Sequence, residues 1–143
     1  MNKKSGFTII EIFVVAIVLM GAGGLFLYQK NHIQATARDD RRKADINTIY
    51  HNLEKVYYSK HKSYPQYLNE KTLPGVHPDT LKDPNGITIN ESKKEALTQI
   101  ETAHSDYSYR AKQCNQTTGN CKSYELQTKL EKEADYKKQS NHK

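Results

Sequence analysis

The sequence predicts an α+β protein in which one long N-terminal helix packs on a small antiparallel sheet. Three observations carry this prediction. An almost unbroken apolar run covers 7–28, a stretch without Pro or Gly covers 29–60, and two alternating segments are joined by a turn with a Cys on either side. With 143 residues in total, the chain has room for one small domain beyond the helix.

The apolar run over 7–28 has the length of a membrane-spanning helix. At about 1.5 Å per residue it would extend about 33 Å, enough to cross a hydrocarbon core of about 30 Å. A cleaved secretory signal is the alternative, but its apolar part usually covers only about 7 to 15 residues. We therefore expect a membrane span, although "GAGG" at 21–24 imitates a signal-peptide cleavage site.

The orientation signals of this span conflict. Lys and Arg are more numerous just after the run than before it, so the positive-inside tendency would place the C-terminal side in the cytoplasm. Against this, Cys114 and Cys121 flank the turn-rich "NQTTGN" between two strand-like segments and suit a disulfide that closes a hairpin. Disulfides persist in oxidising compartments, which favours the opposite orientation.

One acidic residue, Glu11, lies inside the apolar run. Ionisable side chains in membrane spans are rare and usually functional, and each needs a partner. No Lys or Arg lies within helical reach of Glu11 inside the run, so we expect its partner in another molecule.

The stretch "KKSG-FTIIE", Lys3 to Glu11, resembles the class III signal of type IV pilins and pseudopilins. It has a short basic leader that ends in Gly, then Phe, then Glu at the fifth position of an apolar helix. The resemblance implies a leader peptide over 1–6, cleavage by a prepilin peptidase between Gly6 and Phe7, and N-methylation of Phe7. It also implies that Glu11 pairs with the Phe7 amine of a neighbouring subunit, because a cation compensates a carboxylate that is costly in lipid. Finally, it places the C-terminal part outside the cell.

The segment over 29–60 is expected to continue the helix as its amphipathic half. Apolar residues recur at helical spacing: Ile46, Ile49, Tyr50, Leu53, Val56 and Tyr57. The opposite face carries Asp45, Asn52, Glu54, Lys55 and Ser59. We therefore expect one continuous helix from Phe7 to about Ser59, with "RDDRRK" at 38–43 as a solvated face whose mixed charges suit salt bridges between subunits.

Gly21, Gly23 and Gly24 mark a weak point in this helix, since each Gly costs about 1 kcal/mol relative to Ala. One interpretation is close helix packing in the membrane, where small residues are common. The other, implied by the resemblance, is a segment that unwinds on assembly.

The remainder, 61–131, is expected to form a small globular head. All four prolines fall between Ser63 and Gly86, which indicates loops, and "DPNG" at 83–86 is a turn signal. Asp79, Asp83 and Asn85 could supply oxygen ligands to calcium, but their spacing favours turn chemistry. We expect a short strand over 87–90 and a helix over 91–101.

The last part of the head is expected to be the disulfide-closed hairpin. Segments 106–113 and 122–131 alternate with a period of two. Tyr residues should fill the core between helix and sheet: Tyr50, Tyr57, Tyr107, Tyr109 and Tyr124. The alternative role for exposed Tyr and Lys is to stack on and hold single-stranded DNA. A polar, flexible tail is expected over 132–143.

No catalytic constellation, metal-ligand spacing or cofactor motif emerges, so we expect no enzyme and no cofactor.

The resemblance implies a structural subunit of a type IV pilus or pilus-like filament, serving adhesion, twitching motility or DNA uptake. Its partners would be identical or related pilin subunits, the membrane, the prepilin peptidase and the pilus assembly machinery. It would be a single-pass membrane protein first and part of an extracellular filament at the cell surface afterwards. The alternatives are a pseudopilin of a type II secretion or competence machine, and a DNA-binding subunit that uses the net charge of +6.

Overall fold

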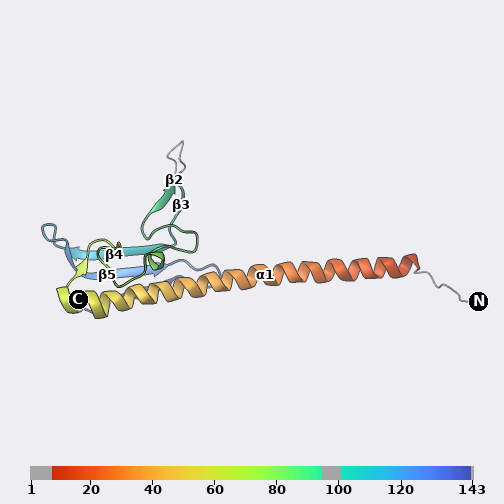
Figure 1. Cartoon of the computed structure of the whole chain (residues 1–143), viewed down its shortest axis with the longest axis horizontal. Helices are drawn as coiled ribbons and strands as arrows, with labels where there is room; N and C mark the ends of the chain where they lie inside the picture. The colour runs from red at the N-terminus through yellow and green to blue at the C-terminus, as the bar shows by residue number, and fades with distance from the viewer. Residues whose placement is uncertain (1–7, 95–100, 143) are drawn as a thin grey trace, which may run out of the picture. The chain divides into compact units, whose positions relative to one another are not determined.

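The computed structural model describes residues 8–94 and 101–142 (Figure 1). The chain divides into two compact units, Met1–Thr36 and Ala37–Lys143. Helix α1 (Ile9–His51) contributes to both units. All the strands belong to the second unit, which is an α+β fold as the sequence predicts.

Helical backbone continues without a break from α1 into η1 (Asn52–Tyr57), a single π-helical stretch, and then into α2 (Tyr58–His61). The helix ends where Lys62 adopts a left-handed conformation (φ 53°) and its N–H donates to the carbonyl of Tyr58 at 2.9 Å. This confirms the predicted long helix.

The π-helical stretch changes which side chains of the helix are buried. Ile46, Ile49 and Leu53 are fully buried, as their spacing predicts, but Val56 is 43% exposed. A π-helix turns by fewer degrees per residue than an α-helix, so residues after Leu53 fall behind their α-helical positions and Val56 leaves the buried face. Glu54, which was expected on the solvated face, is buried instead.

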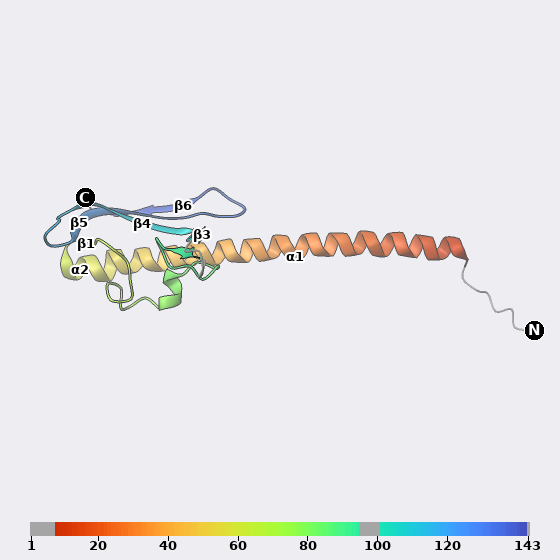
Figure 2. The same ribbon diagram turned by 90° about the horizontal axis from the view of Figure 1, so that it is seen from above.

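The main sheet is built around a long antiparallel hairpin, β4 (Tyr107–Cys114) and β5 (Asn120–Thr128). The second edge of β5 pairs with two short strands, β1 (Tyr64–Pro65) and β6 (Tyr136–Gln139). Figure 2 shows this sheet lying along the last turns of the helix in the second unit. The predicted hairpin is confirmed.

Strand β6 differs from the flexible tail that the sequence suggests for 132–143. Its residues Tyr136 to Gln139 pair in register with the stretch of β5 from Thr128 back to Glu125. The "YKKQ" sequence has no alternation of apolar and polar residues strong enough to reveal a strand. Pairing with β5 therefore determines this element, together with Tyr136, which packs against the core and donates its hydroxyl to Asn47 Oδ1 at 2.9 Å.

A second, two-stranded sheet consists of β2 (Ser92–Lys94) and β3 (Glu101–His104). The sequence predicts a helix over 91–101, and this prediction is wrong at both ends, where the strands lie. Its centre, 95–100, lies outside the described residues.

The segment before β2 is irregular, with one 3₁₀ turn, η2 (Pro78–Leu81). The short strand expected over 87–90 is reduced to a single bridge between Thr88 and Lys82. The turn expected at "DPNG" is present, because the N–H of Gly86 donates to the carbonyl of Asp83 at 2.8 Å and Gly86 has a φ of 80°.

Tyrosine fills much of the core of the second unit. Of the five tyrosines expected there, Tyr107, Tyr109 and Tyr124 are buried and two are half-buried. Tyr64 is also fully buried, although the sequence places it in a loop. Leu, Ile and Val complete the cluster: Ile46, Ile49, Leu53, Leu68, Leu73, Val76, Leu81, Ile89 and Leu126.

The outer edge of β4 is partly covered by one side chain. The amide of Asn90 donates to the carbonyl of Tyr109 at 2.7 Å and accepts from its N–H at 2.9 Å. The N–H of Asn90 also donates to the carbonyl of Tyr107 at 3.2 Å. Asn90 therefore replaces a neighbouring strand at this edge, with a left-handed backbone (φ 62°) that Asn tolerates better than most residues.

Candidate membrane and assembly helix

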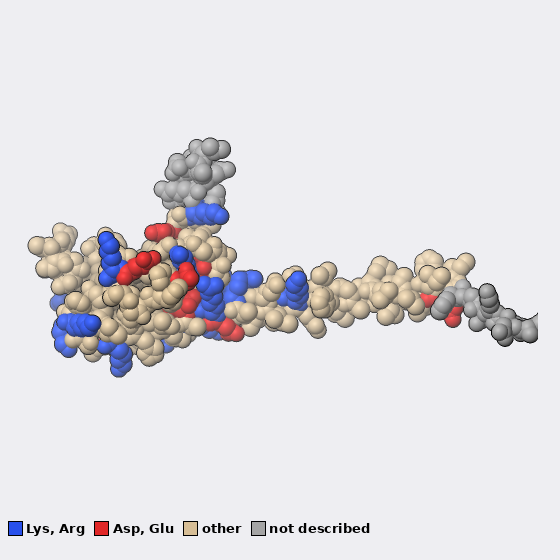
Figure 3. All heavy atoms as spheres, viewed as in Figure 1, with Lys and Arg blue, Asp and Glu red and all other residues tan. Residues whose placement is uncertain are grey.

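The first unit presents large apolar side chains on all sides of α1. Between Ile9 and Tyr28 these side chains are 54% to 76% exposed. In Figure 3 this part of the helix has almost no charged atoms. Within the described residues one helix is long and apolar enough to cross a membrane, by length and composition alone.

Glu11 has hydrogen-bond partners at the start of this helix. The N–H of Thr8 donates to Glu11 Oε2 at 2.8 Å, and the Thr8 hydroxyl donates to the same oxygen at 3.1 Å. The N–H of Glu11 in turn donates to Thr8 Oγ1 at 3.4 Å. This reciprocal arrangement is a capping box, with Thr8 just before the helix and Glu11 three positions later.

The capping box gives Glu11 a role that the sequence analysis missed, although the Thr-x-x-Glu spacing in "TIIE" is its signature. The acid lies in the first turn, where the helix dipole favours negative charge. Its hydrogen bonds come from neutral groups of its own chain. They satisfy its oxygens, but they supply no opposite charge.

Gly21, Gly23 and Gly24 lie within regular helix in the first unit. A Cβ atom added at any of the three would meet nothing within 4 Å. The single chain therefore has no steric need for glycine at these positions. Close packing against a neighbouring helix and unwinding on assembly both remain as interpretations of this weak point.

Gly6 and Phe7, the residues expected at leader cleavage, lie outside the described residues. The first described residue, Thr8, directly follows them. No geometry is therefore assigned to the cleavage site or to the methylated amine.

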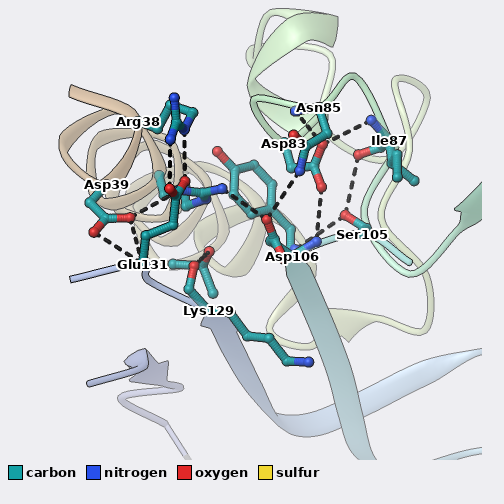
Figure 4. Close-up of polar contacts among 12 residues, drawn as sticks. Arg38, Asp39, Asp83, Asn85, Ile87, Ser105, Asp106, Lys129 and Glu131 are labelled. Carbon is teal, nitrogen blue, oxygen red and sulfur yellow. Dashed lines mark hydrogen bonds and ion pairs between the residues drawn. The ribbon is translucent and has the colours of Figure 1, made fainter. Parts of the chain in front are cut away.

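The second unit holds a buried cluster of charges around Arg42, whose side chain is 3% exposed. Its guanidinium donates to Asp39 Oδ1 at 2.9 Å, to Glu131 Oε1 at 2.7 Å and to Asp106 Oδ2 at 2.9 Å. Arg38 adds two hydrogen bonds to Glu131, at 2.7 and 2.6 Å (Figure 4). The cluster fastens α1 to the chain just before β4 and to the chain after β5.

Two carboxylates of this cluster, Glu131 and Asp39, have lowered pKa values. Hydrogen bonds from Arg38 and then Arg42 lower the pKa of Glu131 to about 2. Burial alone would raise the pKa of Asp39. Hydrogen bonds from the N–H groups of Glu131 and Lys132, and from Arg42, outweigh burial, and the pKa of Asp39 is lowered.

The interpretation of "RDDRRK" as a solvated helix face is therefore wrong for two of its residues. Asp39 and Arg42 are 2% and 3% exposed. They lie three positions apart on the face of α1 that packs within the second unit, and their ion pairs are made within the chain. Sequence reasoning missed this because the partners, Asp106 and Glu131, are far away along the chain.

Asp83 extends the polar contacts on the other side of Asp106 (Figure 4). Asp83 Oδ1 accepts from the N–H groups of Asn85 and Ile87, each at 2.9 Å. Asp83 Oδ2 accepts from the N–H of Asp106 at 2.9 Å. The carboxylate thus organises the turn and joins it to the start of β4.

Another buried acid, Glu54, lies between the helix and the sheet, with a side chain only 2% exposed. The Tyr64 hydroxyl donates to both of its oxygens, at 3.0 and 3.1 Å, and the Tyr124 hydroxyl donates at 2.8 Å. The N–H of Asn141 donates at 3.3 Å, and His142 Nε2 lies 3.9 Å away. Burial, and then these hydrogen bonds, raise the pKa of both tyrosines.

The predicted disulfide between Cys114 and Cys121 is present. The two cysteines face each other across the end of the β4–β5 hairpin. Five residues, 115–119, form the turn that the disulfide closes. Asn115 and Thr117 are exposed in it, and the N–H of Thr117 donates to Asn115 Oδ1 at 2.8 Å.

The comparisons with known proteins add no relatives. A scan against protein-family models, a search of curated proteins and a search of solved structures each find no match to this chain.

Proposed function

We propose that this chain is a structural subunit of a type IV pilus or a pilus-like extracellular filament. The observation that carries the proposal is one ionisable side chain, Glu11, at the start of an otherwise apolar and exposed helix. The helix follows a short basic leader that ends in Gly6, and Phe7 is the first residue after that leader.

The first unit needs a covering that it does not supply itself. A helix that is apolar on all sides is stable in a lipid bilayer or in the core of a larger assembly, and it is unstable in water. A filament subunit uses both environments, first as a membrane span over 7–28 and later as one helix packed among others. The exposed apolar side chains from Ile9 to Tyr28 support both roles.

The environment of Glu11 supports a step that depends on charge. The capping box satisfies the carboxylate oxygens with neutral donors, so the ionised acid still lacks a cation. Cleavage after Gly6 would create a positively charged amine at Phe7. The Phe7 amine of an incoming subunit would then provide an attractive partner for Glu11 in a medium where charges interact strongly.

The second unit suits an exposed head. It has its own core, a buried ion cluster and a disulfide, and disulfides persist outside the cytoplasm. These features would keep the head folded after its helix leaves the membrane.

The first experiment is to shear filaments from cells and to measure the intact mass of the protein in the sheared and membrane fractions. A mass that begins at methylated Phe7, abundant in the sheared fraction, would support a surface pilin. The same processed mass confined to the membrane would instead support the pseudopilin alternative. An uncut chain would overturn both.

A Glu11→Gln variant separates the two roles of the acid. Gln at this position also supports a capping box, so membrane level and leader cleavage should be unchanged. The variant cannot pair with a cation, and we expect the sheared filament yield to fall at least about tenfold, which corresponds to about 1.4 kcal/mol. Glu70→Gln, at an exposed position of the second unit, is the matched control and should leave the yield unchanged. Wild-type yield from Glu11→Gln would exclude the charge-pairing step.

A further inference from the structure

Three segments of the second unit meet at the end of the helix and form a surface that we call the basic pole. They are 55–63, 120–123 and 139–142. Tyr64 pairs with Cys121 in the sheet, which brings the first two segments together. The ring of Tyr58 stacks on His142, with centroids 4.0 Å apart and planes within 4°, which adds the third.

The basic pole carries cations without accompanying acids. None of its three segments contains Asp or Glu. Its exposed lysines are Lys55, Lys60, Lys62 and Lys122. Glu54 lies beside the basic pole, with Oε2 3.9 Å from His142 Nε2, but it is buried and its oxygens accept hydrogen bonds from tyrosines. In Figure 3, the α2 end of the visible face shows Lys side chains without acidic neighbours.

Several cations elsewhere on this unit are paired with acids. The ion pairs are Arg38–Glu131, Arg41–Asp45, Lys43–Glu133, Lys82–Asp79 and Lys112–Glu125. None of the four lysines of the basic pole has such a partner within the described residues. A one-sign surface of this kind attracts anions and raises their local concentration.

Aromatic rings lie among the lysines of the basic pole. The rings of Tyr57 and His61 are 4.4 Å apart, and Lys62 Nζ lies 5.8 Å from the centre of the Tyr58 ring. Tyr57 and Tyr58 are half-buried, and His61 and His142 are exposed. Lysines that contact phosphates, combined with rings on which bases can stack, are the common features of surfaces that bind single-stranded nucleic acid.

We propose that the basic pole binds single-stranded DNA, with the four lysines on the phosphates and the rings of Tyr57, His61 and His142 against bases. The inference rests on the filament proposal only for its setting, because that proposal places the second unit outside the cell. The binding itself needs neither leader cleavage nor assembly.

The test uses the full chain in detergent micelles and a short fluorescein-labelled single-stranded oligonucleotide, with binding followed by fluorescence anisotropy. If the four lysines contact about four phosphates, affinity should fall about 50-fold between 50 and 200 mM salt. A pole variant with Lys55, Lys60, Lys62 and Lys122 changed to Gln should lose most of the affinity and most of the salt dependence.

The matched control changes four exposed lysines outside the basic pole to Gln, namely Lys71, Lys129, Lys132 and Lys137. Both variants have the same net charge, so a general charge effect would weaken them equally and would overturn the proposal. A control variant that keeps near wild-type affinity would support it. Circular dichroism and intact mass check that each variant is folded and oxidised.

Labelled heparin provides a second probe in the same assay. Binding of heparin without binding of the oligonucleotide would overturn the proposal in favour of a sulfated polysaccharide. No binding of either probe would also overturn it, and it would leave the filament proposal untouched, since shearing and intact mass measure a different property. Conversely, an uncut chain that binds the oligonucleotide through the basic pole would overturn only the filament proposal.

Discussion

Three buried charged side chains, Asp39, Arg42 and Glu54, hold the helix of the second unit against its sheet. A charge removed from water is stable only when its hydrogen-bonding groups are matched by partners. Arg42 has three carboxylate partners for its two terminal nitrogens, while its buried Nε has none within the described residues, and Glu54 has two tyrosine hydroxyls. These contacts are specific in direction, so they fix the position of the helix along the sheet more narrowly than apolar packing does.

Removing the Glu54 carboxylate should destabilise the second unit strongly. Glu54→Ala leaves the hydroxyls of Tyr64 and Tyr124 buried without their acceptor, and we expect a loss of about 3 kcal/mol in the free energy of unfolding. Glu70→Ala, at an exposed position, should change it by at most about 0.5 kcal/mol. Urea unfolding of the full chain in micelles, followed by near-ultraviolet circular dichroism of tyrosine, measures both. A loss from Glu54→Ala as small as that of the control would contradict the buried contacts.

The guanidinium of Arg42 should matter more than that of its neighbour. Arg42→Met leaves three carboxylates without their shared cation, and we expect a cost of about 4 kcal/mol. Arg41→Met removes a side chain that is 52% exposed, and it should cost about 0.5 kcal/mol or less. The same unfolding measurement compares the two variants, and equal effects would show that Arg42 is not the centre of the cluster.

The ion cluster also predicts loss of stability in acid. The pKa of Glu131 lies at about 2 in the folded chain against an ordinary value of 4.5, so its contribution is present at neutral pH. It should decline as the pH falls below about 4.5 and disappear as the pH falls through about 2. Melting temperatures across this range should fall less steeply for Glu131→Gln than for the wild type. Parallel curves would contradict the lowered pKa.

At the scale of elements, local patterns identified the long helix and the β4–β5 hairpin. Apolar residues recur at helical spacing at Ile46, Ile49 and Leu53. In the two segments that flank the cysteines, residues alternate with the period of a strand. Strand β6 was missed because its pairing with β5 and the packing of Tyr136 against the core arise between segments that are distant in the sequence. The helix expected over 91–101 was wrong at its two ends, because helix propensity is weak when few apolar residues anchor it.

The partners of the buried charges were beyond any local pattern. Glu54 lies in the π-helical stretch and is buried against Tyr64 and Tyr124, which come from two different strands. Asp39 and Arg42 likewise meet Asp106 and Glu131 through the folded topology. By contrast, the Thr8–Glu11 capping box is a local pattern that the sequence already contains.

Reducing the Cys114–Cys121 disulfide should loosen the hairpin. The bond closes a short loop, and the chain-entropy model assigns it about 2.5 kcal/mol. We expect the double variant Cys114→Ser and Cys121→Ser to unfold at a lower urea concentration by about that free energy. Treatment of the wild type with a reductant should produce the same shift, and treatment of the double variant should produce none. A reductant effect on the double variant would point to a different cause.

At the scale of the whole molecule, the apolar exposed part of α1 decides where the protein resides. We expect the full chain to stay in the membrane pellet after alkaline carbonate extraction, because its exposed apolar side chains need a lipid environment. A variant with Ile17 and Val18 each changed to Arg should be released, since each central Arg costs about 2.5 to 3.5 kcal/mol. Leu68→Met, a conservative change in the second unit, serves as the control and should stay in the pellet. Release of the wild type would contradict a membrane span.

The turn over 115–119 has a practical consequence. It is tied at its base by the disulfide and lies at the end of a paired hairpin, so a few added residues there would be isolated from the folded core. A protease cut inside the turn would also leave the two pieces covalently joined. This turn is therefore the place to insert an affinity tag or attach a dye, and a label there would make single filaments visible on living cells.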